Sequence, residues 1–503
     1  MRTFEILILI ALVPLIAGLA SRPMRRSAWL RALAWTAFVL ALLHLVIEGY
    51  RWQMIPAYLL IVSACLRTRK ARAEAAQGSR RRQAVRLARG VLGMAAWTVA
   101  LVLGVGNPVF HYPMPTGPYS VGTARLYFSD LSRQDPFAPN PRTPRELLVV
   151  AWYPADVTPG ARTERFWPDA PASIPAVAEA FHLPPFNFLQ HLRLVRSHSY
   201  VNASVTRGRY PVLIFSHGYL STPWQNTVQM EELASHGFIV FSIGHTYESA
   251  AIPFPGDRIA SVNQARMKAA TGNRSQLKEF TAQSLDVWVA DTRYVLDELT
   301  RIDAEPGTRF SHCLDLTRLG VFGMSFGGAT AGEFCAQERR CKAGINMDGF
   351  QHGTLGERPL AVPFLYFAAG EGAHENDPIY AGSRSDFYTV QVRHATHINF
   401  SDANLVVPIL KYVGVLGAID SQQMESLLNV YTLAFFQQYL QGRQSGLLDG
   451  PPPTDRYPEV VVRARKPPAA VRWIHIDPMG GSALQHVYPP NVAQRLPTSS
   501  ARD

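Results

Sequence analysis

Serine, aspartate and histidine residues occur in this chain in an order and spacing suited to nucleophilic catalysis. Ser325 lies within Gly323-Met324-Ser325-Phe326-Gly327, Asp348 follows 23 residues later, and His397 follows after a further 49. A serine hydroxyl becomes an effective nucleophile when a histidine accepts its proton, and a carboxylate orients that histidine and stabilises its charged form. The three residues together therefore predict ester hydrolysis or acyl transfer through a covalent acyl-enzyme.

The five residues around Ser325 have the form of a nucleophile elbow. The preceding run Leu319–Phe322 is apolar enough for a buried strand, and Gly328 and Ala329 continue a series of small residues that lets a helix pack closely. A sharp turn from strand to helix exposes the serine hydroxyl, and glycines two positions to either side avoid collisions there. A glycine-rich turn with an incidental serine is the competing interpretation, because the five-residue pattern alone recurs by chance.

Asp348 and His397 each fall where a loop is expected to follow a strand. Asp348 comes directly after the apolar run Ala343–Met347, and His397 comes shortly after Tyr388–Val392. Asp348 has an alternative role as a turn or helix-capping residue. His394 competes with His397 for the role of general base, and the residue pattern leaves both candidates open.

Two backbone amides are candidates for stabilising the oxyanion of the acyl-transfer intermediate. One belongs to Phe326, directly after the serine, and the other to Tyr219, in the loop after the apolar run Val212–Phe215. His217 and His245 precede the serine in the chain and are expected to be structural. No metal or cofactor is expected, because a side chain supplies the nucleophile and backbone dipoles stabilise the charge.

Apolar runs alternate with helical patterns through most of the chain. The runs are Leu147–Trp152, Val212–Phe215, Phe238–Ile243, Leu319–Phe322, Ala343–Met347, Val362–Phe367 and Tyr388–Val392. The helical patterns are Thr227–Ser235, Gln276–Thr300, Gly328–Ala336 and Met424–Leu440. Such alternation predicts an α/β fold, with a mostly parallel sheet covered by helices on both faces. The loops that follow the strands then bring Ser325, Asp348 and His397 to one edge of the sheet.

Four apolar stretches come before this region. They are Phe4–Ala20, Ser27–Ile47, Met54–Leu66 and Gly90–Phe110. A helix that spans a membrane needs about 20 mostly apolar residues, a length that the second and fourth stretches reach. The first is slightly short and the third is doubtful. We predict about four transmembrane helices. His44 and Glu48, near the end of the second stretch, are expected to be a snorkelling or loop-facing pair, with a functional pair in the membrane as the alternative.

The formal net charge of +11 is confined to the N-terminal region. Residues 1–89 contain 15 Lys and Arg but three acidic residues, which leaves 34 basic and 35 acidic residues of the totals of 49 and 38. This distribution argues against a nucleic-acid-binding globular domain and for a signal of membrane topology. The basic clusters follow the first and third stretches. Placing both in the cytoplasm predicts four crossings and a large domain on the periplasmic or extracellular side.

Two other interpretations of the N-terminal region remain open. The first stretch could be a cleaved signal peptide that ends at Gly18-Leu19-Ala20. The third stretch could be re-entrant or interfacial, which would move the large domain into the cytosol.

The chain is expected to contain three regions. Residues 1–110 form the membrane-embedded helical region, residues 111–445 the catalytic domain, and residues 446–503 a Pro-rich extended tail. Within the domain, Asp156–Tyr210 is expected to be an insertion or cap. Cys313, Cys335 and Cys341 allow a single disulfide, and the sequence does not choose its partners.

Several segments resemble the secreted platelet-activating-factor acetylhydrolases, also known as lipoprotein-associated phospholipases A2. The matching segments are Thr116–Gly122, Phe215–Gly218, Ser235–Val240, Gly323–Thr330 and Thr396–Asp402. The similarity extends over roughly residues 115–440. It implies an α/β-hydrolase fold with Ser325, Asp348 and His397 as the triad, His397 being preferred to His394.

The resemblance also implies that the amides of Tyr219 and Phe326 form the oxyanion hole. This chain departs from the family at Met324, where a histidine is usual, and in its apolar N-terminal region, which the secreted enzymes lack. Their lipoprotein partners are therefore not expected here.

The resulting expectation is a membrane-anchored serine ester hydrolase. The resemblance implies phospholipids with short or oxidised acyl groups as substrates, without a need for calcium. A broad-specificity carboxylesterase or an acyltransferase on small esters would use the same residues. A non-catalytic, membrane-anchored binding protein with a hydrolase fold is a further alternative from a different class.

Overall fold

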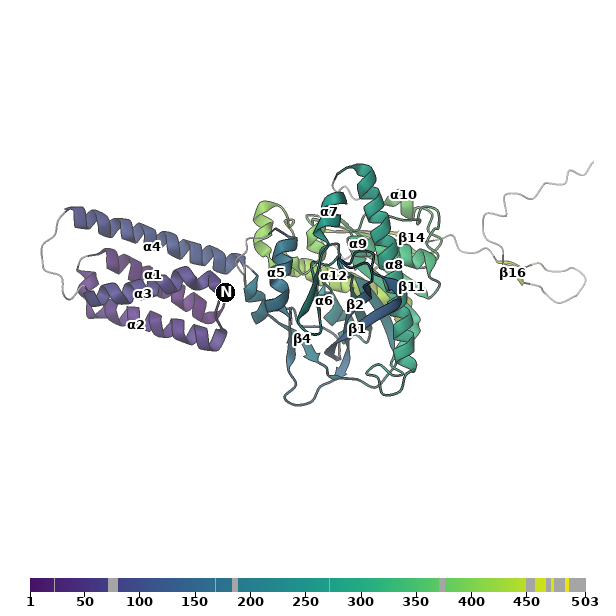
Figure 1. Ribbon diagram of the computed structural model, residues 1–503, viewed down its shortest axis with the longest axis horizontal. Coiled ribbons are helices and arrows are strands. Elements are labelled where there is room, and N and C mark those ends of the chain that lie inside the picture. The colour runs from purple at the N-terminus through teal and green to yellow at the C-terminus, as the bar shows by residue number, and fades with distance from the viewer. Residues whose placement is uncertain are drawn as a thin grey trace, which may run out of the picture.

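A helical bundle precedes an α/β domain in this protein (Figure 1). The computed structural model describes residues 1–21, 23–70, 80–167, 169–182, 189–270, 272–370, 376–448, 457–466, 472–474 and 485–487. Most of the expected tail after residue 446 lies outside the described residues. Part of that region is nevertheless a strand of the sheet, as described below.

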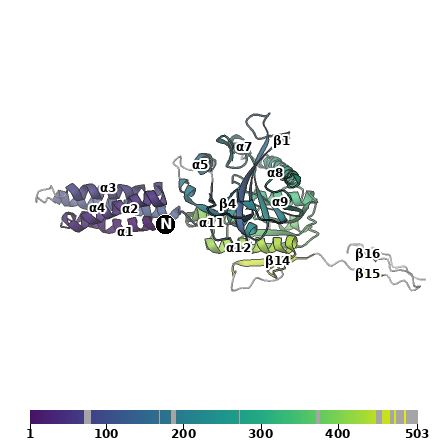
Figure 2. The ribbon, with the colours of Figure 1, turned by 90° about the horizontal axis from the view of Figure 1, so that it is seen from below.

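Four helices lie side by side in the bundle (Figures 1 and 2). They are α1 (Thr3–Ala20), α2 (Ala28–Leu43), α3 (Ile55–Lys70) and α4 (Arg80–Gly106). Small buried residues such as Ala34, Ala37, Ala57 and Ala64 let the helices approach closely. Three helices in the described part of the chain are long and apolar enough to cross a membrane: Thr3–Ala20, Ala28–Glu48 and Gln83–Gly106. With 16 residues, α3 is not among them, so the expected number of four is not confirmed.

The α/β domain is built on a sheet of 12 strands in the order β14-β13-β12-β11-β10-β6-β7-β2-β1-β4-β3, with β5 also paired to β2. Its central strands are β6 (Tyr210–Ser216), β7 (Ile239–Gly244), β10 (Leu314–Met324), β11 (Cys341–Met347), β12 (Phe364–Ala369) and β13 (Phe387–Val392). Each adjacent pair within this group of six strands is parallel. This core confirms the mostly parallel sheet that the apolar runs predict.

The remaining strands extend the sheet on both sides. On one side they are β1 (Ser120–Gln134), β2 (Pro144–Asp156), β3 (Thr163–Arg165), β4 (Arg196–Val201) and β5 (Ser204–Val205). Part of the expected insertion Asp156–Tyr210 thus pairs with the sheet edge. On the other side, β14 (Val460–Arg465) is antiparallel to β13, although the sequence predicts an extended tail there. Short hairpins are formed by β8 (Ala251–Phe254) with β9 (Arg258–Ser261) and by β15 (Arg472–Ile474) with β16 (Gln485–Val487).

Helices cover both faces of the sheet (Figure 2). Side chains of α6 (Thr227–Ser235) and α12 (Ser421–Phe436) pack on one face, in a core that includes Leu213, Phe215 and Phe322. Side chains of α8 (Arg274–Ala304) and α9 (Phe326–Gln337) pack on the other, with Val212, Ile214 and Val321. Shorter helices are α5 (Ala170–Ala180), α7 (Gln264–Ala270), α10 (Asp377–Tyr380) and α11 (Ala403–Val406). This arrangement confirms the α/β-hydrolase fold.

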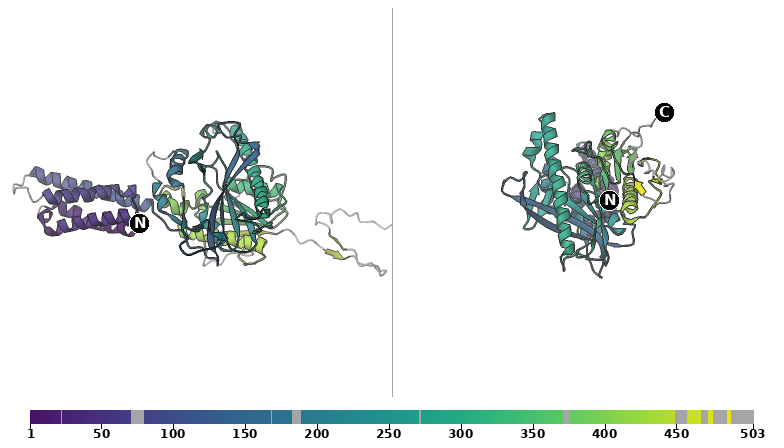
Figure 3. Two further views of the ribbon diagram at one scale, coloured as in Figure 1. Left: turned by 60° about the horizontal axis from the view of Figure 1, so that its bottom comes forward. Right: turned by 90° about the vertical axis from the view of Figure 1, so that its right-hand side faces the viewer.

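One end of the bundle contacts the α/β domain (Figure 3). The Gln53 side chain lies 3.1 Å from Nδ1 of His191, and Arg193 donates a hydrogen bond to the Tyr50 carbonyl at 3.2 Å. Gly106, at the end of α4, lies against Ile409, because a Cβ added there would be 2.5 Å from its Cδ1. The opposite end of the bundle, where α1 and α3 end, points away from the domain (Figure 1).

An ionic network closes the bundle at the end next to the domain. Glu5 is fully buried and pairs with Arg2 at 2.8 Å and with Arg51 at 2.9 Å. His44 is also fully buried, 2.8 Å from the Tyr58 hydroxyl and 3.8 Å from Glu48. The expectation of a snorkelling or loop-facing His44 is therefore wrong. Mutual pairing offsets part of the cost of burying these charges.

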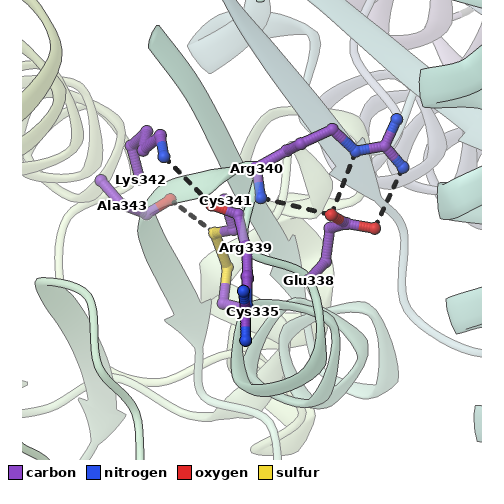
Figure 4. The surroundings of a disulfide bond; sticks show 7 residues. All are labelled: Cys335, Glu338, Arg339, Arg340, Cys341, Lys342 and Ala343. Atoms are coloured by element: carbon purple, nitrogen blue, oxygen red, sulfur yellow. Dashed lines mark hydrogen bonds and ion pairs between the residues drawn. A yellow bond between two sulfur atoms is a disulfide. The ribbon is translucent and has the colours of Figure 1, made fainter. Parts of the chain in front are cut away.

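A disulfide joins Cys335, near the end of α9, to Cys341, at the start of β11 (Figure 4). It closes the turn in which Arg340 pairs with Glu338 at 3.0 Å. Cys313 is a free thiol, so the structure selects one pair from the three cysteines that the sequence left open.

Candidate active site

Ser325 occupies a strained turn between β10 and α9. Its backbone has φ 57° and ψ −122°, in the left-handed region of φ that non-glycine residues seldom adopt. A Cβ at Gly327 would be 1.9 Å from the Ser216 carbonyl oxygen, and one at Gly323 would be 2.3 Å from the Gly327 backbone. Both glycines are therefore required by close backbone contacts. The turn has the geometry of a nucleophile elbow.

His397 bridges the serine and an aspartate. Its Nε2 lies 2.8 Å from Oγ of Ser325, and its Nδ1 lies 2.7 Å from Oδ2 of Asp348. The other oxygen of Asp348 accepts a hydrogen bond from the Ala369 amide at 2.7 Å, which fixes the carboxylate. The His397 side chain is 43% exposed, so solvent and substrate reach it. The other candidate, His394, has an exposed side chain, and it is His397 that faces the serine.

The loop after β6 lies beside the serine. A Cβ on Gly218 would be 3.2 Å from that of Ser325, so the loop comes within contact distance. The amides on either side of Tyr219 are engaged: Gly218 donates to Gln225 at 2.6 Å and Leu220 to the Glu248 carbonyl at 3.1 Å. The Tyr219 amide itself has no acceptor among the described residues, and Phe326 begins α9, where amides lack partners within the helix.

A pocket of about 430 Å³ opens over Ser325 and His397. Its walls are largely aromatic and include Tyr219, Phe280, Phe326 and Phe350. Burial lowers the pKa of His352, which also lines the pocket, and so favours the neutral form of this histidine. The pocket is therefore suited to an uncharged group attached to the reacting carbonyl.

A second set of the same three residue types lies in the core. Nε2 of His245 is 3.1 Å from Oγ of Ser216, and its Nδ1 is 2.9 Å from Oδ2 of Asp291. His245 and Asp291 are fully buried and Ser216 is 1% exposed. Arg145 binds both oxygens of Asp291, at 3.1 and 2.6 Å. This internal set does not line the pocket.

The surroundings of the internal set fix the protonation states of its histidine and aspartate. Burial lowers the pKa of His245 to about 4, although Asp291 opposes the shift. Burial raises the pKa of Asp291, but the charge of Arg145 and the hydrogen bond from His245 outweigh it and hold this pKa below its usual range. Trp288 stacks on His245 at 3.8 Å and packs edge-on against Phe326 at 4.9 Å. Through Trp288, the internal set thus supports Phe326, whose amide is one of the two candidate oxyanion donors.

His217 is structural in the same region. It is fully buried, and its Nε2 lies 2.7 Å from the Ser249 hydroxyl. Burial lowers its pKa to about 3. His217 and His245 therefore both stay neutral at pH 7, and neither lines the pocket over Ser325.

Sequence reasoning missed several residues of the site. Gln225 orders the loop after β6 by accepting a hydrogen bond from the Gly218 amide. Its Nε2 also lies 3.2 Å from the sulfur of Met324, the residue that departs from the family pattern. Phe280 comes from α8 and Phe350 from the loop after Asp348. No local motif marks these positions, because pocket walls in this fold are assembled from distant loops.

Comparisons with known proteins agree with the fold and with the class of carboxylic ester hydrolases. A ferulic acid esterase from Streptomyces cinnamoneus superposes with a TM-score of 0.59 at 27% identity, covering 71% of this chain and 99% of that structure. A probable 1-alkyl-2-acetylglycerophosphocholine esterase of Arthroderma benhamiae is 26% identical over 70% of this chain and 93% of its own length. The platelet-activating factor acetylhydrolase of Cavia porcellus is 28% identical over 47% of this chain and 58% of its own length.

Fold and relatives together define a carboxylic ester hydrolase of the α/β-hydrolase class. Residues 107–446 match the family model of platelet-activating factor acetylhydrolase, isoform II. The chain belongs to this family, as the sequence motifs suggest.

Proposed function

We propose that this protein is a membrane-anchored serine ester hydrolase whose triad is Ser325, His397 and Asp348. The observation that carries the proposal is the hydrogen-bonded bridge of His397 between Ser325 and Asp348 at the base of an open pocket. Geometry of this kind is what an activated nucleophile requires.

In the proposed reaction, Ser325 gives its proton to Nε2 of His397 while its oxygen attacks the ester carbonyl carbon. The resulting oxyanion accepts hydrogen bonds from the amides of Tyr219 and Phe326. The intermediate then expels the alcohol, which takes the proton from His397 and leaves an acyl-enzyme. Water, deprotonated by His397, releases the acid and restores Ser325. Asp348 holds the imidazole in the required tautomer throughout.

The proposed substrates are phospholipids with a short acyl group. The name of the Arthroderma benhamiae relative refers to an acetylated glycerophosphocholine. The pocket volume of about 430 Å³ lies towards the lower end of the range of roughly 300–1,000 Å³ usual for ligand sites. A short acyl chain fits such a space better than a long one.

A second candidate is an esterase that acts on aromatic acyl groups. The solved structural relative is a ferulic acid esterase, and the rings of Phe280, Phe326 and Phe350 line the pocket. The two candidates differ in the group that the pocket accepts, and they share every catalytic residue.

The bundle supports an integral membrane anchor with the catalytic domain on the periplasmic or extracellular side. Arg25, Arg67 and Arg89 line one cavity together with Ala20, the last residue of α1, and this end of the bundle points away from the domain (Figure 1). The positive-inside rule assigns such a basic end to the cytoplasm. In the bundle, α3 runs alongside α1 and α4, which favours four crossings. The disulfide between Cys335 and Cys341 fits an oxidising compartment.

The substrate is tested on full-length protein in detergent, with Ser325→Ala as the inactive reference. The panel pairs a phospholipid carrying an acetyl group with a simple acetyl ester, and adds a feruloyl ester. We expect the acetylated phospholipid to give the highest kcat/KM. A higher value for the feruloyl ester would establish the second candidate. Product transfer to an added alcohol would identify an acyltransferase.

The orientation is tested with reporter fusions after residue 466 in cells. We expect activity from a reporter that works outside the cytosol and none from one that works in the cytosol. The reverse pattern would show that the chain crosses the membrane an odd number of times, or enters it with the opposite orientation.

A further inference from the structure

A second cavity lies at the end of the bundle remote from the α/β domain. Its volume is about 410 Å³, and it is formed between α1, α3 and α4, with one residue from the short helix Met24–Arg26. No described residue of the hydrolase domain lines it. The cavity is therefore unrelated to the site that contains Ser325.

The mouth of this cavity is strongly basic. Arg25, Arg67, Arg86 and Arg89 line it, and no Asp or Glu is found among the described lining residues. Within the described chain, Arg67, Arg86 and Arg89 form no ion pair. Several guanidinium groups around one cavity are suited to binding phosphate, which arginine recognises with paired hydrogen bonds.

The interior of the cavity is apolar. Leu12, Leu15, Ile16 and Leu60 form much of its wall. The lining residues of α1 run from Leu12 to Ala20, and eight residues of helix correspond to about 12 Å. A free phosphate would need only the basic mouth. A ligand that uses the whole cavity has an anionic head and a hydrocarbon chain.

Two glycines of α4 shape the cavity. Gly90 and Gly93 both line it. A Cβ on Gly93 would be 3.2 Å from Ile16, and one on Gly90 would be 3.4 Å from the Cβ of Ala20. Larger side chains at these positions would therefore enter the space between α4 and α1.

We propose that this cavity binds an anionic phospholipid, with the phosphate held by the four arginines and an acyl chain along Leu12, Leu15 and Ile16. The inference rests on the proposed membrane anchor and is independent of the chemistry at Ser325. The basic end is the one that the charge distribution assigns to the cytoplasmic leaflet, where anionic lipids are concentrated. The bound lipid would tie α1, α3 and α4 together at the end that the ionic network around Glu5 does not reach.

The test uses full-length protein in detergent and ether-linked phosphatidylglycerol, which an ester hydrolase cannot cleave. Lipid binding is measured as the concentration dependence of the thermal unfolding midpoint. Ether-linked phosphatidylcholine and inorganic phosphate serve as the other two ligands. We expect stabilisation by phosphatidylglycerol and none by the other two at the same concentration. An equal effect of phosphatidylcholine, or an effect of inorganic phosphate as large as that of the lipid, would overturn the proposal.

Three variants locate the site. Arg67→Gln combined with Arg89→Gln should weaken phosphatidylglycerol binding by at least about tenfold, since charged hydrogen bonds are lost. Gly90→Leu should weaken it comparably by filling the cavity without changing the charge. Arg69→Gln is the matched control, because Arg69 lies two residues from Arg67, over the ring of Trp35 at 4.9 Å, and does not line the cavity.

The outcomes separate this proposal from the proposed enzyme activity. Retained binding in both the double variant and Gly90→Leu would overturn the site, as would an equal loss in Arg69→Gln, which would indicate unspecific attraction. All variants should hydrolyse a soluble acetyl ester at the unmodified rate. An inactive unmodified protein that still binds the lipid would contradict the enzyme proposal alone.

Discussion

Two sets of serine, histidine and aspartate with nearly the same internal distances occur in the described part of the chain. In the open set, His397 lies 2.8 Å from Ser325 and 2.7 Å from Asp348. In the internal set, His245 lies 3.1 Å from Ser216 and 2.9 Å from Asp291. The His397 side chain is 43% exposed, whereas that of His245 is completely buried. Distances alone therefore do not distinguish a candidate catalyst from a structural element.

Three features of their surroundings distinguish the open set from the internal set. The open set adjoins a pocket that no residue of the internal set lines, and the two candidate oxyanion amides lie beside Ser325. The internal aspartate is bound on both oxygens by Arg145, so its charge is already compensated. The strained backbone of Ser325, with φ 57°, projects its hydroxyl from a turn, whereas Ser216 ends a regular strand. Access to a pocket, an aspartate not bound by an arginine among the described residues, and backbone geometry together distinguish the candidate site.

The two serines should give the largest contrast. We expect Ser325→Ala to lower kcat/KM by at least several hundredfold, because the nucleophile is lost. Ser216→Ala should lower it less than about threefold, since its single hydrogen bond is structural and typically contributes about 1 kcal/mol. Hydrolysis of an acetyl ester measures both. If Ser216→Ala lost as much kcat/KM as Ser325→Ala while its thermal stability was unchanged, the distinction between a catalytic and a structural serine would be wrong.

Replacing Asp348, the aspartate of the open set, should lower the rate of catalysis and leave the stability of the fold intact. We expect Asp348→Asn to lower kcat by on the order of 10³- to 10⁴-fold, because an amide favours the wrong tautomer of His397. The thermal midpoint should change little, since the replacement has the same shape. Steady-state kinetics and thermal unfolding check the two halves of this expectation. A rate within tenfold of the unmodified protein would remove Asp348 from the triad.

The internal aspartate should show the opposite behaviour. Asp291→Asn leaves the fully buried Arg145 with less compensation of its charge, and breaking a buried pair typically costs about 3–5 kcal/mol. We expect the free energy of unfolding, measured in urea, to fall by this amount. The protein that remains folded should keep most of its kcat. Asp291→Asn with unchanged stability and a large loss of rate would place the internal set in the reaction.

The smallest contrast is a pH dependence of stability. The pKa of His245 is about 4 in the folded protein and about 6.5 when unfolded. The unfolded state therefore binds more protons between these values, and stability is full above about pH 6.5 and declines towards pH 4, by up to about 3 kcal/mol. His217, whose pKa is about 3, acts in the same direction.

Urea unfolding between pH 4.5 and 7.5 measures this dependence. The His245→Gln variant should lose a slope of about one proton in that window, because one titrating group has been removed. A slope unaffected by His245→Gln would show that this histidine is not held neutral by the fold.

Much of the fold could be predicted because its signals are local. Buried parallel strands are continuous apolar runs, and each of the runs from Val212 to Val392 lies within or overlaps a strand of the sheet. The strand β1, Ser120–Gln134, went unrecognised because its exposed and buried positions do not alternate regularly. The strand β14, Val460–Arg465, depends on pairing with β13, and most of its side chains are not buried.

The amino-acid sequence alone is enough to locate the elbow around Ser325, to predict the α/β class and to confine the excess positive charge to the first 89 residues. These features depend on neighbouring residues, on periodicity or on composition. Only the tertiary structure decided that His397 faces Ser325, that Cys335 pairs with Cys341, and that the second set is enclosed. Each of these depends on contacts between residues far apart in the chain, whose distances are set by how helices pack on the sheet.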